Sequence, residues 1–222
     1  MKIENPELIN ALVDSLPVNF LSHLHQSIPG VYSEAYAMAF DAPTLQKPEA
    51  EYLMPHNRRA LFETSFRQAA IDSGLKASAK PNRRATASYS LIEAGPFLIT
   101  ASYVCEPRKF VRSALFRNSH AELNKYLAQG QLFGEEKKEE EDSTAKANKI
   151  YCILLHGADA ENSKKLGFMQ FAFPDMENKK WVDDFDFMDV MNTSLNRKAT
   201  ASHQEQDNAY PSVKRKTQRG SE

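Results

Sequence analysis

Arginine side chains supply the clearest candidate chemistry in this sequence, because they recur in three segments between positions 58 and 117. A guanidinium group is planar and can donate two parallel hydrogen bonds to a phosphate or a carboxylate. Arginines that converge in a fold therefore form a surface for nucleic acid or for an acidic protein. The residues predicted to form this surface are Arg58, Arg59, Arg83, Arg84, Arg108 and Arg112. Further basic residues in the same segments are Arg67, Lys80, Lys109 and Arg117.

The same arginines have a second interpretation as scattered solubilising charges, some of them paired with carboxylates. The chain carries 28 Lys and Arg residues against 29 Asp and Glu residues, which gives a formal net charge of -1. No overall positive field therefore draws the protein to nucleic acid, and binding would require a local basic patch. The two interpretations differ in whether the three segments converge in space.

A different candidate chemistry is the metal-dependent hydrolysis of nucleic acid. Residues 174 to 179 contain the pieces of a PD…ExK nuclease signature, in which acids hold a divalent cation and a lysine positions the attacking water. Here all the pieces fall within one predicted turn, so polar turn residues are the preferred interpretation. The nuclease alternative requires a degenerate site in which Glu93 and Asp175 meet from different elements.

Other catalytic and cofactor-binding motifs are absent from the sequence. It contains no Walker loop, no Gly-x-Gly-x-x-Gly fingerprint, no Gly-x-Ser-x-Gly elbow and no zinc-binding spacing. His156 follows a predicted buried strand, where α/β enzymes place site residues, but a local hydrogen bond is its default role. The sequence therefore favours a non-catalytic protein with no cofactor and no bound metal, and a metal-dependent nuclease if the protein is an enzyme.

The elements that position the arginines centre on residues 86 to 127. Residues 89 to 92 and 97 to 104 are rich in aromatic and β-branched side chains that partly alternate, and Gly95 and Pro96 lie between them. This pattern predicts a β-hairpin. The basic segment 76 to 84 is expected to be a surface loop that leads into it.

A helix is predicted from about Arg108, because Pro107 suits a first helical turn. Arg108 and Arg112 would then lie four residues apart and share one face of that helix. A Ser-x-x-Glu capping box at Ser119 predicts a new helical segment, which ends near Gly130.

The rest of the chain predicts an α+β fold, with N-terminal helices followed by a mostly antiparallel sheet of four or more strands and one interrupting helix. Helices are predicted at 6–16, at 17–27 with a break at Pro29-Gly30, at 55–73 with Gly74 as its stop, and at 181–191. Residues 31 to 40 are compatible with either a helix or a strand. The apolar runs 150–155 and 166–173 predict further strands.

Residues 1–194 are predicted to form a single globular domain, which contains a mobile charged excursion at about 134–148. Residues 195–222 are predicted to form a disordered basic tail. The chain is 41% hydrophobic, and Cys105 and Cys152 both lie in apolar runs, which suggests buried thiols in a reducing compartment. With no apparent signal peptide and no run of membrane-spanning length, we expect a cytoplasmic protein without a membrane partner.

The sequence thus favours a non-catalytic cytoplasmic module that binds nucleic acid or an acidic protein through an arginine-rich surface. A diverged metal-dependent nuclease is the alternative. A further alternative is an interaction or immunity-type protein that pairs with one protein partner through its helical N-terminal half. An exposed, contiguous apolar patch on that half would favour this last alternative.

Overall fold

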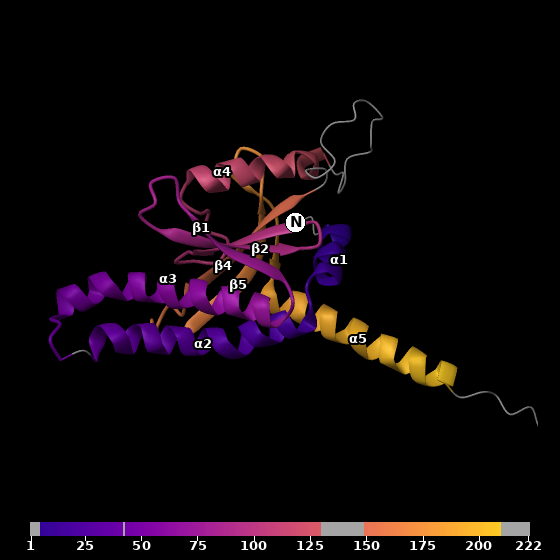
Figure 1. The fold of residues 1–222 in the computed structure, drawn as a ribbon, viewed down its shortest axis with the longest axis horizontal. Helices are drawn as coiled ribbons and strands as arrows, with labels where there is room; N and C mark the ends of the chain where they lie inside the picture. The colour runs from indigo at the N-terminus through magenta and orange to yellow at the C-terminus, as the bar shows by residue number, and fades with distance from the viewer. Residues whose placement is uncertain (1–4, 42, 130–148, 210–222) are drawn as a thin grey trace, which may run out of the picture.

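A computed structural model describes residues 5–41, 43–129 and 149–209 of the chain. Three N-terminal helices precede a six-stranded sheet, which is interrupted by one helical segment and followed by a C-terminal helix (Figure 1). The helices are α1 (Pro6–Ser15), α2 (Val18–Phe40), α3 (Lys47–Asp72), α4 (Leu115–Ala121), the 3-10 helix η1 (Glu122–Gln129) and α5 (Phe187–Ala209). The strands are β1 (Lys76–Pro81), β2 (Ser88–Ala94), β3 (Phe97–Tyr103), β4 (Ile150–Ala158), β5 (Leu166–Pro174) and β6 (Trp181–Asp186).

The order of the strands in the sheet is the same as their order in the chain, from β1 to β6. Every neighbouring pair is antiparallel except β3 and β4, which run parallel. A parallel pair requires a long crossover connection, and α4 and η1 lie in that connection. The predicted α+β fold with a mostly antiparallel sheet is confirmed.

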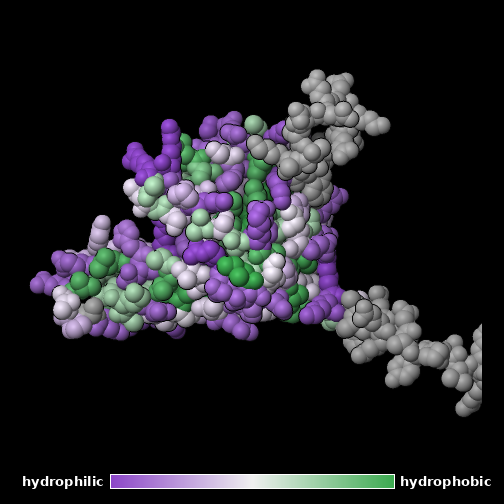
Figure 2. All heavy atoms as spheres, in the orientation of Figure 1, coloured by the Kyte–Doolittle hydropathy of each residue, from purple (hydrophilic) through white to green (hydrophobic). Residues whose placement is uncertain are grey.

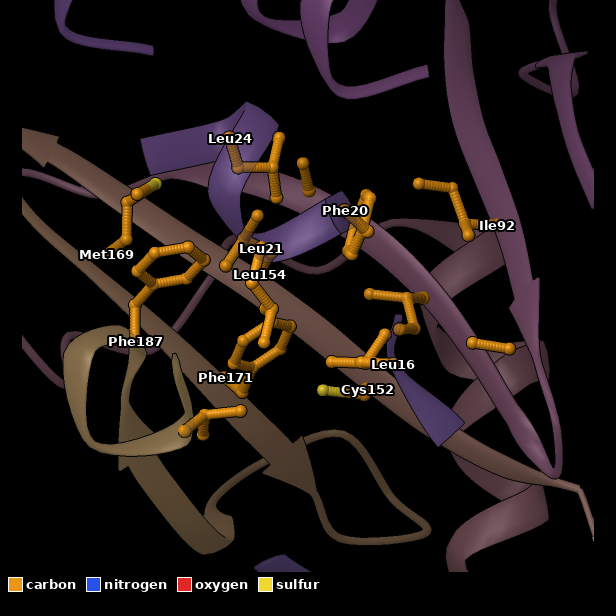
Figure 3. Close-up of a cluster of buried hydrophobic side chains, with 14 of the residues drawn as sticks. Leu16, Phe20, Leu21, Leu24, Ile92, Cys152, Leu154, Met169, Phe171 and Phe187 are labelled. Atoms are coloured by element: carbon orange, nitrogen blue, oxygen red, sulfur yellow. The ribbon is translucent and has the colours of Figure 1, made fainter. Parts of the chain in front are cut away.

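Helices cover both faces of the sheet, with α2 and α3 on one face and α4 on the other (Figure 1). Side chains of β4 alternate between two apolar clusters, with Leu154 facing α2 and Tyr151 facing α4. This burial on both sides explains the uninterrupted apolar run that predicted the strand. Figure 3 shows Phe20 and Leu21 of α2 directed toward Leu154 and toward Phe171 of β5 in the larger cluster.

Two helices continue through prolines, so the predicted helix break at Pro29-Gly30 is wrong. Helix α2 contains Pro29 and α3 contains Pro55, and both rings are exposed to solvent. A proline removes one helical hydrogen bond and strains one turn. In α2 the buried stripe continues on both sides of the proline, through Ile28 and Val31, and packing against α3 keeps the helix intact. Residues 31 to 40 are therefore helical.

Two strands lie where other structures were predicted. Residues 76 to 81 form the edge strand β1 instead of a loop, and its last residue, Pro81, suits an edge position. Lys76 on this strand forms an ion pair with Glu93 of β2, with 2.9 Å between Nζ and Oε1. Residues 181 to 186 pair with β5 as strand β6, so the helix predicted from 181 begins only at Phe187.

Helix α5 runs through Ala209, into the segment predicted as a disordered tail, and residues 210–222 lie outside the described residues. The predicted charged excursion at 134–148 lies outside them as well. Cys152 is buried as predicted, whereas Cys105 is exposed in the turn after β3. Among the described helices, none has the length and the apolar character needed to cross a membrane.

Candidate nucleic-acid interface

The sheet splits between β2 and β3. These strands pair only over the three residues next to their turn, from Ile92 opposite Ile99 to Ala94 opposite Phe97. Beyond that point β2 continues to pair with β1 as far as Ser88, and β3 continues to pair with β4 as far as Tyr103. The first half of β2 and the second half of β3 therefore diverge, and polar side chains lie along the split.

One face of α3 supplies the first set of these side chains. Arg59, Glu63 and Arg67 are spaced four residues apart, so they share a face of the helix. Arg59 donates from Nη2 to the carbonyl oxygen of Ser88 at 3.1 Å, and Arg67 donates from Nη1 to Oγ of Ser90 at 3.0 Å. Glu63 accepts a 2.6 Å hydrogen bond from the backbone N–H of Ser90, a residue beyond the last β2–β3 pair.

Glu63 is a partly buried carboxylate in a basic environment. Burial raises the pKa of Glu63, and the hydrogen bonds from Ser90 and the charges of Arg59 and Arg67 oppose that rise. No arginine of the described chain forms an ion pair with Glu63. The guanidinium groups beside it are consequently not neutralised by direct contact.

Helix α4 supplies a further arginine from the other face of the sheet. Arg117 donates from Nη1 to the carbonyl oxygen of Arg112 at 2.9 Å and from Nη2 to Oγ of Ser102 at 3.0 Å. Its Nε is buried and has no hydrogen-bond partner. Burial lowers the pKa of Arg117, and the positive charge of Arg59 lowers it further, whereas Tyr151 and Glu63 raise it.

An aromatic contact joins the start of β2 to helix α4. The rings of Tyr89, at the start of β2, and Phe116, in α4, stack with their centroids 3.9 Å apart. This contact fixes the β1–β2 turn, residues 82–87, beside the start of α4 (Figure 1). Arg83 and Arg84 are exposed on that turn, and Figure 2 shows hydrophilic side chains projecting at this end of the molecule.

Four of the six predicted arginines thus lie at one end of the molecule, together with two arginines outside the predicted set. We call this surface the basic end. Its residues are Arg59, Arg67, Arg83, Arg84, Arg112 and Arg117. The spacing of Arg59, Glu63 and Arg67 along α3 is a signal in the sequence from which Arg67 could have been included.

Arg58 does not belong to the basic end. It is only 3% exposed and lies on the α2 side of the sheet, with its guanidinium over the rings of Tyr32 at 4.7 Å and Tyr103 at 5.0 Å. Its Nη2 donates to the carbonyl oxygen of Ser163 in the β4–β5 turn at 3.0 Å. Arg58 therefore holds helix α3 and that turn together inside the protein.

Arg108 lies elsewhere as well, because the helix predicted to begin there does not form and α4 begins at Leu115. Arg108 has a positive φ of 63°, and its backbone N–H donates to Gln170 of β5 at 3.0 Å. Its Nε forms an ion pair with Asp184 of β6 at 3.1 Å. These tertiary contacts hold the segment in a non-helical conformation, so Arg108 and Arg112 share no helix face.

His156 takes part in a separate buried cluster. Its Nδ1 is 2.8 Å from the hydroxyl oxygen of Tyr32, and its ring stacks on Phe62 with centroids 3.5 Å apart. Burial lowers the pKa of His156 to about 3, and the charge of Arg58 lowers it further. The histidine is therefore neutral and joins α2 and α3 to β4, by a contact between distant segments instead of a local one.

The two carboxylates of the nuclease alternative lie apart. Strands β3 and β4 separate Glu93 on β2 from Asp175 after β5, which corresponds to about 14 Å between backbones. Asp175 accepts hydrogen bonds from the backbone N–H groups of Lys179 and Lys180, as expected of a polar turn residue. In the described part of the chain, no three His, Cys, Asp or Glu residues are grouped so that they could hold a metal ion.

Comparison of this chain with protein-family models, with curated proteins and with solved structures gives no match.

Proposed function

We propose that this protein binds nucleic acid by contacting phosphate groups with the arginines of the basic end. The observation that carries the proposal is the ion-pairing state of these arginines. None of the six forms an ion pair with a carboxylate in the described residues, whereas Arg108 and Arg197, at other places on the surface, pair with Asp184 and Asp14.

Unpaired guanidinium groups on one surface create a local positive potential, even though the chain as a whole is close to neutral. A phosphate backbone complements such a surface, because each contact releases condensed counterions from the nucleic acid. Arg83, Arg84 and Arg112 are exposed, so their guanidinium groups are accessible to phosphates, and hydrogen bonds to Ser88 and Ser90 position Arg59 and Arg67.

The test is fluorescence anisotropy with labelled single- and double-stranded DNA and RNA across a series of salt concentrations. We expect affinity to fall as salt rises. In the Arg83→Ala/Arg84→Ala variant, the slope of log K against log salt for a duplex should decrease by about 2, because each phosphate contact contributes about 0.9.

The matched control is Lys179→Ala/Lys180→Ala, which removes two adjacent exposed cations from the β5–β6 turn. It should leave both affinity and slope unchanged. Equal losses in the two variants would show a non-specific charge effect and contradict the proposal. Absence of binding at low salt would also contradict it and would direct attention to an acidic protein as the partner. Cleavage that depends on Mg²⁺ would instead support the nuclease alternative.

A second candidate function is pairing with a protein through the α2–α3 hairpin. Figure 1 shows this hairpin extending past the edge of the sheet, and Met38 and Tyr52 near its free end are 52% and 71% exposed. A pull-down would distinguish the two candidates. A partner retained by Arg83→Ala/Arg84→Ala but lost with Met38→Asp/Tyr52→Asp would support the hairpin.

A further inference from the structure

We propose that Arg83 and Arg84 enter the minor groove of double-stranded DNA and favour A·T-rich sequences. The two arginines lie at the tip of the β1–β2 ribbon, which consists of strands β1 and β2 and the turn between them, residues 76–94. This inference rests on the proposed function and deepens it, because it names the kind of nucleic acid that the basic end recognises.

The turn that carries the two arginines is held in one conformation by Asn82. The carbonyl oxygen of Asn82 accepts a hydrogen bond from the backbone N–H of Ala85 at 2.9 Å, which closes a β-turn. The side chain of Asn82 accepts from the backbone N–H of Thr86 and donates to its hydroxyl oxygen, both at 3.1 Å. Arg83 and Arg84 therefore occupy the two central positions of a closed turn, at the outermost point of the ribbon.

The tip is narrow, and its arginines are free to bind a ligand. Both are exposed, and in the described part of the chain neither side chain makes a hydrogen bond or an ion pair. The residues on either side of them have short side chains, and these residues are Pro81, Asn82, Ala85, Thr86, Ala87 and Ser88. The two guanidinium groups can therefore pass between the phosphate backbones of a groove that is about 6 Å wide, as the minor groove is.

Only the tip of the ribbon can enter a groove, because helices pack on both faces of β2. From α3, Arg59, Glu63 and Arg67 bind β2 on one face. On the other face, Tyr89 stacks on Phe116 of α4. A ribbon that reads the major groove lies in it with one face, and that face is not available here. The tip suits the minor groove, because the negative potential of a narrow A·T-rich minor groove attracts arginine.

Cations lie on both sides of the ribbon, where the two phosphate backbones of a groove would pass. Arg59 reaches the carbonyl oxygen of Ser88 from the α3 side. Lys80 is opposite Tyr89 in the register, and opposite residues of an antiparallel pair share a face, so Lys80 lies on the α4 side. Both cations are exposed. A single strand has only one backbone and would leave one of these two sides without a phosphate.

The experiment is fluorescence anisotropy with three labelled duplexes of equal length, namely an A-tract DNA, a G·C-rich DNA and an A·U-rich RNA. The A-tract DNA should bind about tenfold more tightly than the G·C-rich DNA, a difference that readout of groove shape can produce. The RNA should bind no more tightly than the G·C-rich DNA, because its minor groove is wide and shallow. Netropsin, which fills the A·T minor groove, should displace the protein from the A-tract DNA.

The Arg83→Lys/Arg84→Lys variant separates readout of the groove from charge. Lysine keeps both charges, so the slope of log K against log salt should not change. An ammonium group is more strongly hydrated than a guanidinium group, so the preference for the A-tract DNA should fall to about twofold or less. Asn82→Ala removes the side-chain hydrogen bonds that fix the turn, and it should reduce the preference without any change in charge. Arg112→Ala is the control, and it should weaken both DNA duplexes equally and keep the preference.

Equal affinity for the A-tract and G·C-rich duplexes would overturn the assignment to the minor groove and leave the proposed function standing. A preference that persists in Arg83→Lys/Arg84→Lys would overturn it as well, and so would an A-tract complex that netropsin does not displace. Absence of binding to all three duplexes and to single strands would refute both the assignment and the proposed function.

Discussion

Single residues in this protein differ in role even when they are adjacent in sequence. Arg58 and Arg59 were predicted to act together, but on a helix neighbouring residues point about 100° apart. Arg59 reaches Ser88 at the split, whereas Arg58 lies under the β4–β5 turn against Tyr32. The sequence indicates that both residues are on a helix. Which of the two reaches the split depends on the side of α3 against which the strands pack, and the sequence does not show that side.

The buried His156 should make the stability of the protein depend on pH. Its pKa is about 3 in the folded state and about 6.5 in the unfolded chain. Between these values the unfolded state binds the extra proton, so the stability contributed by this group is fully present above pH 6.5 and is lost as pH falls toward 3. The loss from this group approaches about 1.4 kcal/mol per pH unit.

Urea unfolding at several pH values tests this expectation. His156→Phe should flatten the dependence of the free energy of unfolding on pH between 4 and 6, relative to the unmodified protein. His25→Ala, at an exposed position on α2, should keep the original dependence. If the free energy of unfolding depended on pH equally in His156→Phe and in the unmodified protein, His156 would not be the source of that dependence.

Glu63 should have the opposite effect on stability. Because burial raises its pKa in the folded state, its contribution to stability is present at low pH and is lost as pH rises through the folded pKa. Glu63→Gln keeps an acceptor for Ser90 and removes the charge, so it should raise the melting temperature at pH 7 and have less effect near pH 4. Glu93→Gln, at a carboxyl group whose pKa Lys76 lowers, should not raise the melting temperature. A lower melting temperature for Glu63→Gln at pH 7 would count against this reasoning.

At the scale of elements, the sequence predicts strands and helices well where the pattern of side chains is local. The β2–β3 hairpin, with Gly95 at a φ of 53°, and the strands β4 and β5 are confirmed. Errors occur where tertiary contacts override local signals. Pairing with β5 makes residues 181 to 186 a strand, and contacts with Gln170 and Asp184 keep the segment at Arg108 from becoming a helix.

Pro29 lies inside α2 and should destabilise this helix. Pro29 is exposed and removes one hydrogen bond from the middle of a helix whose neighbouring turns are buried. Pro29→Ala should therefore stabilise the protein by about 1–3 kcal/mol in urea unfolding. Pro48→Ala is the control, because a proline in the first turn of α3 costs little, and it should change stability by less than about 1 kcal/mol. Equal changes in the free energy of unfolding for the two substitutions would contradict the expected destabilising effect of Pro29.

At the scale of the whole molecule, the basic end depends on segments that are distant in the sequence. Its residues come from α3, the β1–β2 turn and the connection from β3 to α4. Composition reveals none of this, since the total charge is -1. The three basic segments were predicted to form a surface if they converge, and the structure brings four of the six named arginines to one end. The sequence does not reveal the split between β2 and β3. A strand pattern shows which residues are extended, but it does not show which of them pair with the neighbouring strand.

Local opening of the protein should differ between the strands on the two sides of the β2–β3 split. Strands β1 and β2 are joined to the rest of the sheet through three residue pairs, whereas β3, β4 and β5 are paired along most of their lengths. In hydrogen–deuterium exchange, the amides of β1 and the first half of β2 should exchange faster than those of β4. Nucleic acid should slow the first group and leave β4 unchanged. Uniform exchange over all strands would contradict this expectation.

Because few residue pairs join β2 to β3, side-chain contacts hold much of the β1–β2 pair of strands in place, among them the stack of Tyr89 on Phe116 and the hydrogen bond from Ser90 to Glu63. Any motion of these strands that a ligand stops costs conformational entropy and reduces the affinity. A cross-link or a better-packed side chain between β2 and its neighbours would therefore strengthen binding without adding any contact to the ligand. The affinity could in this way be tuned at residues that the ligand does not touch.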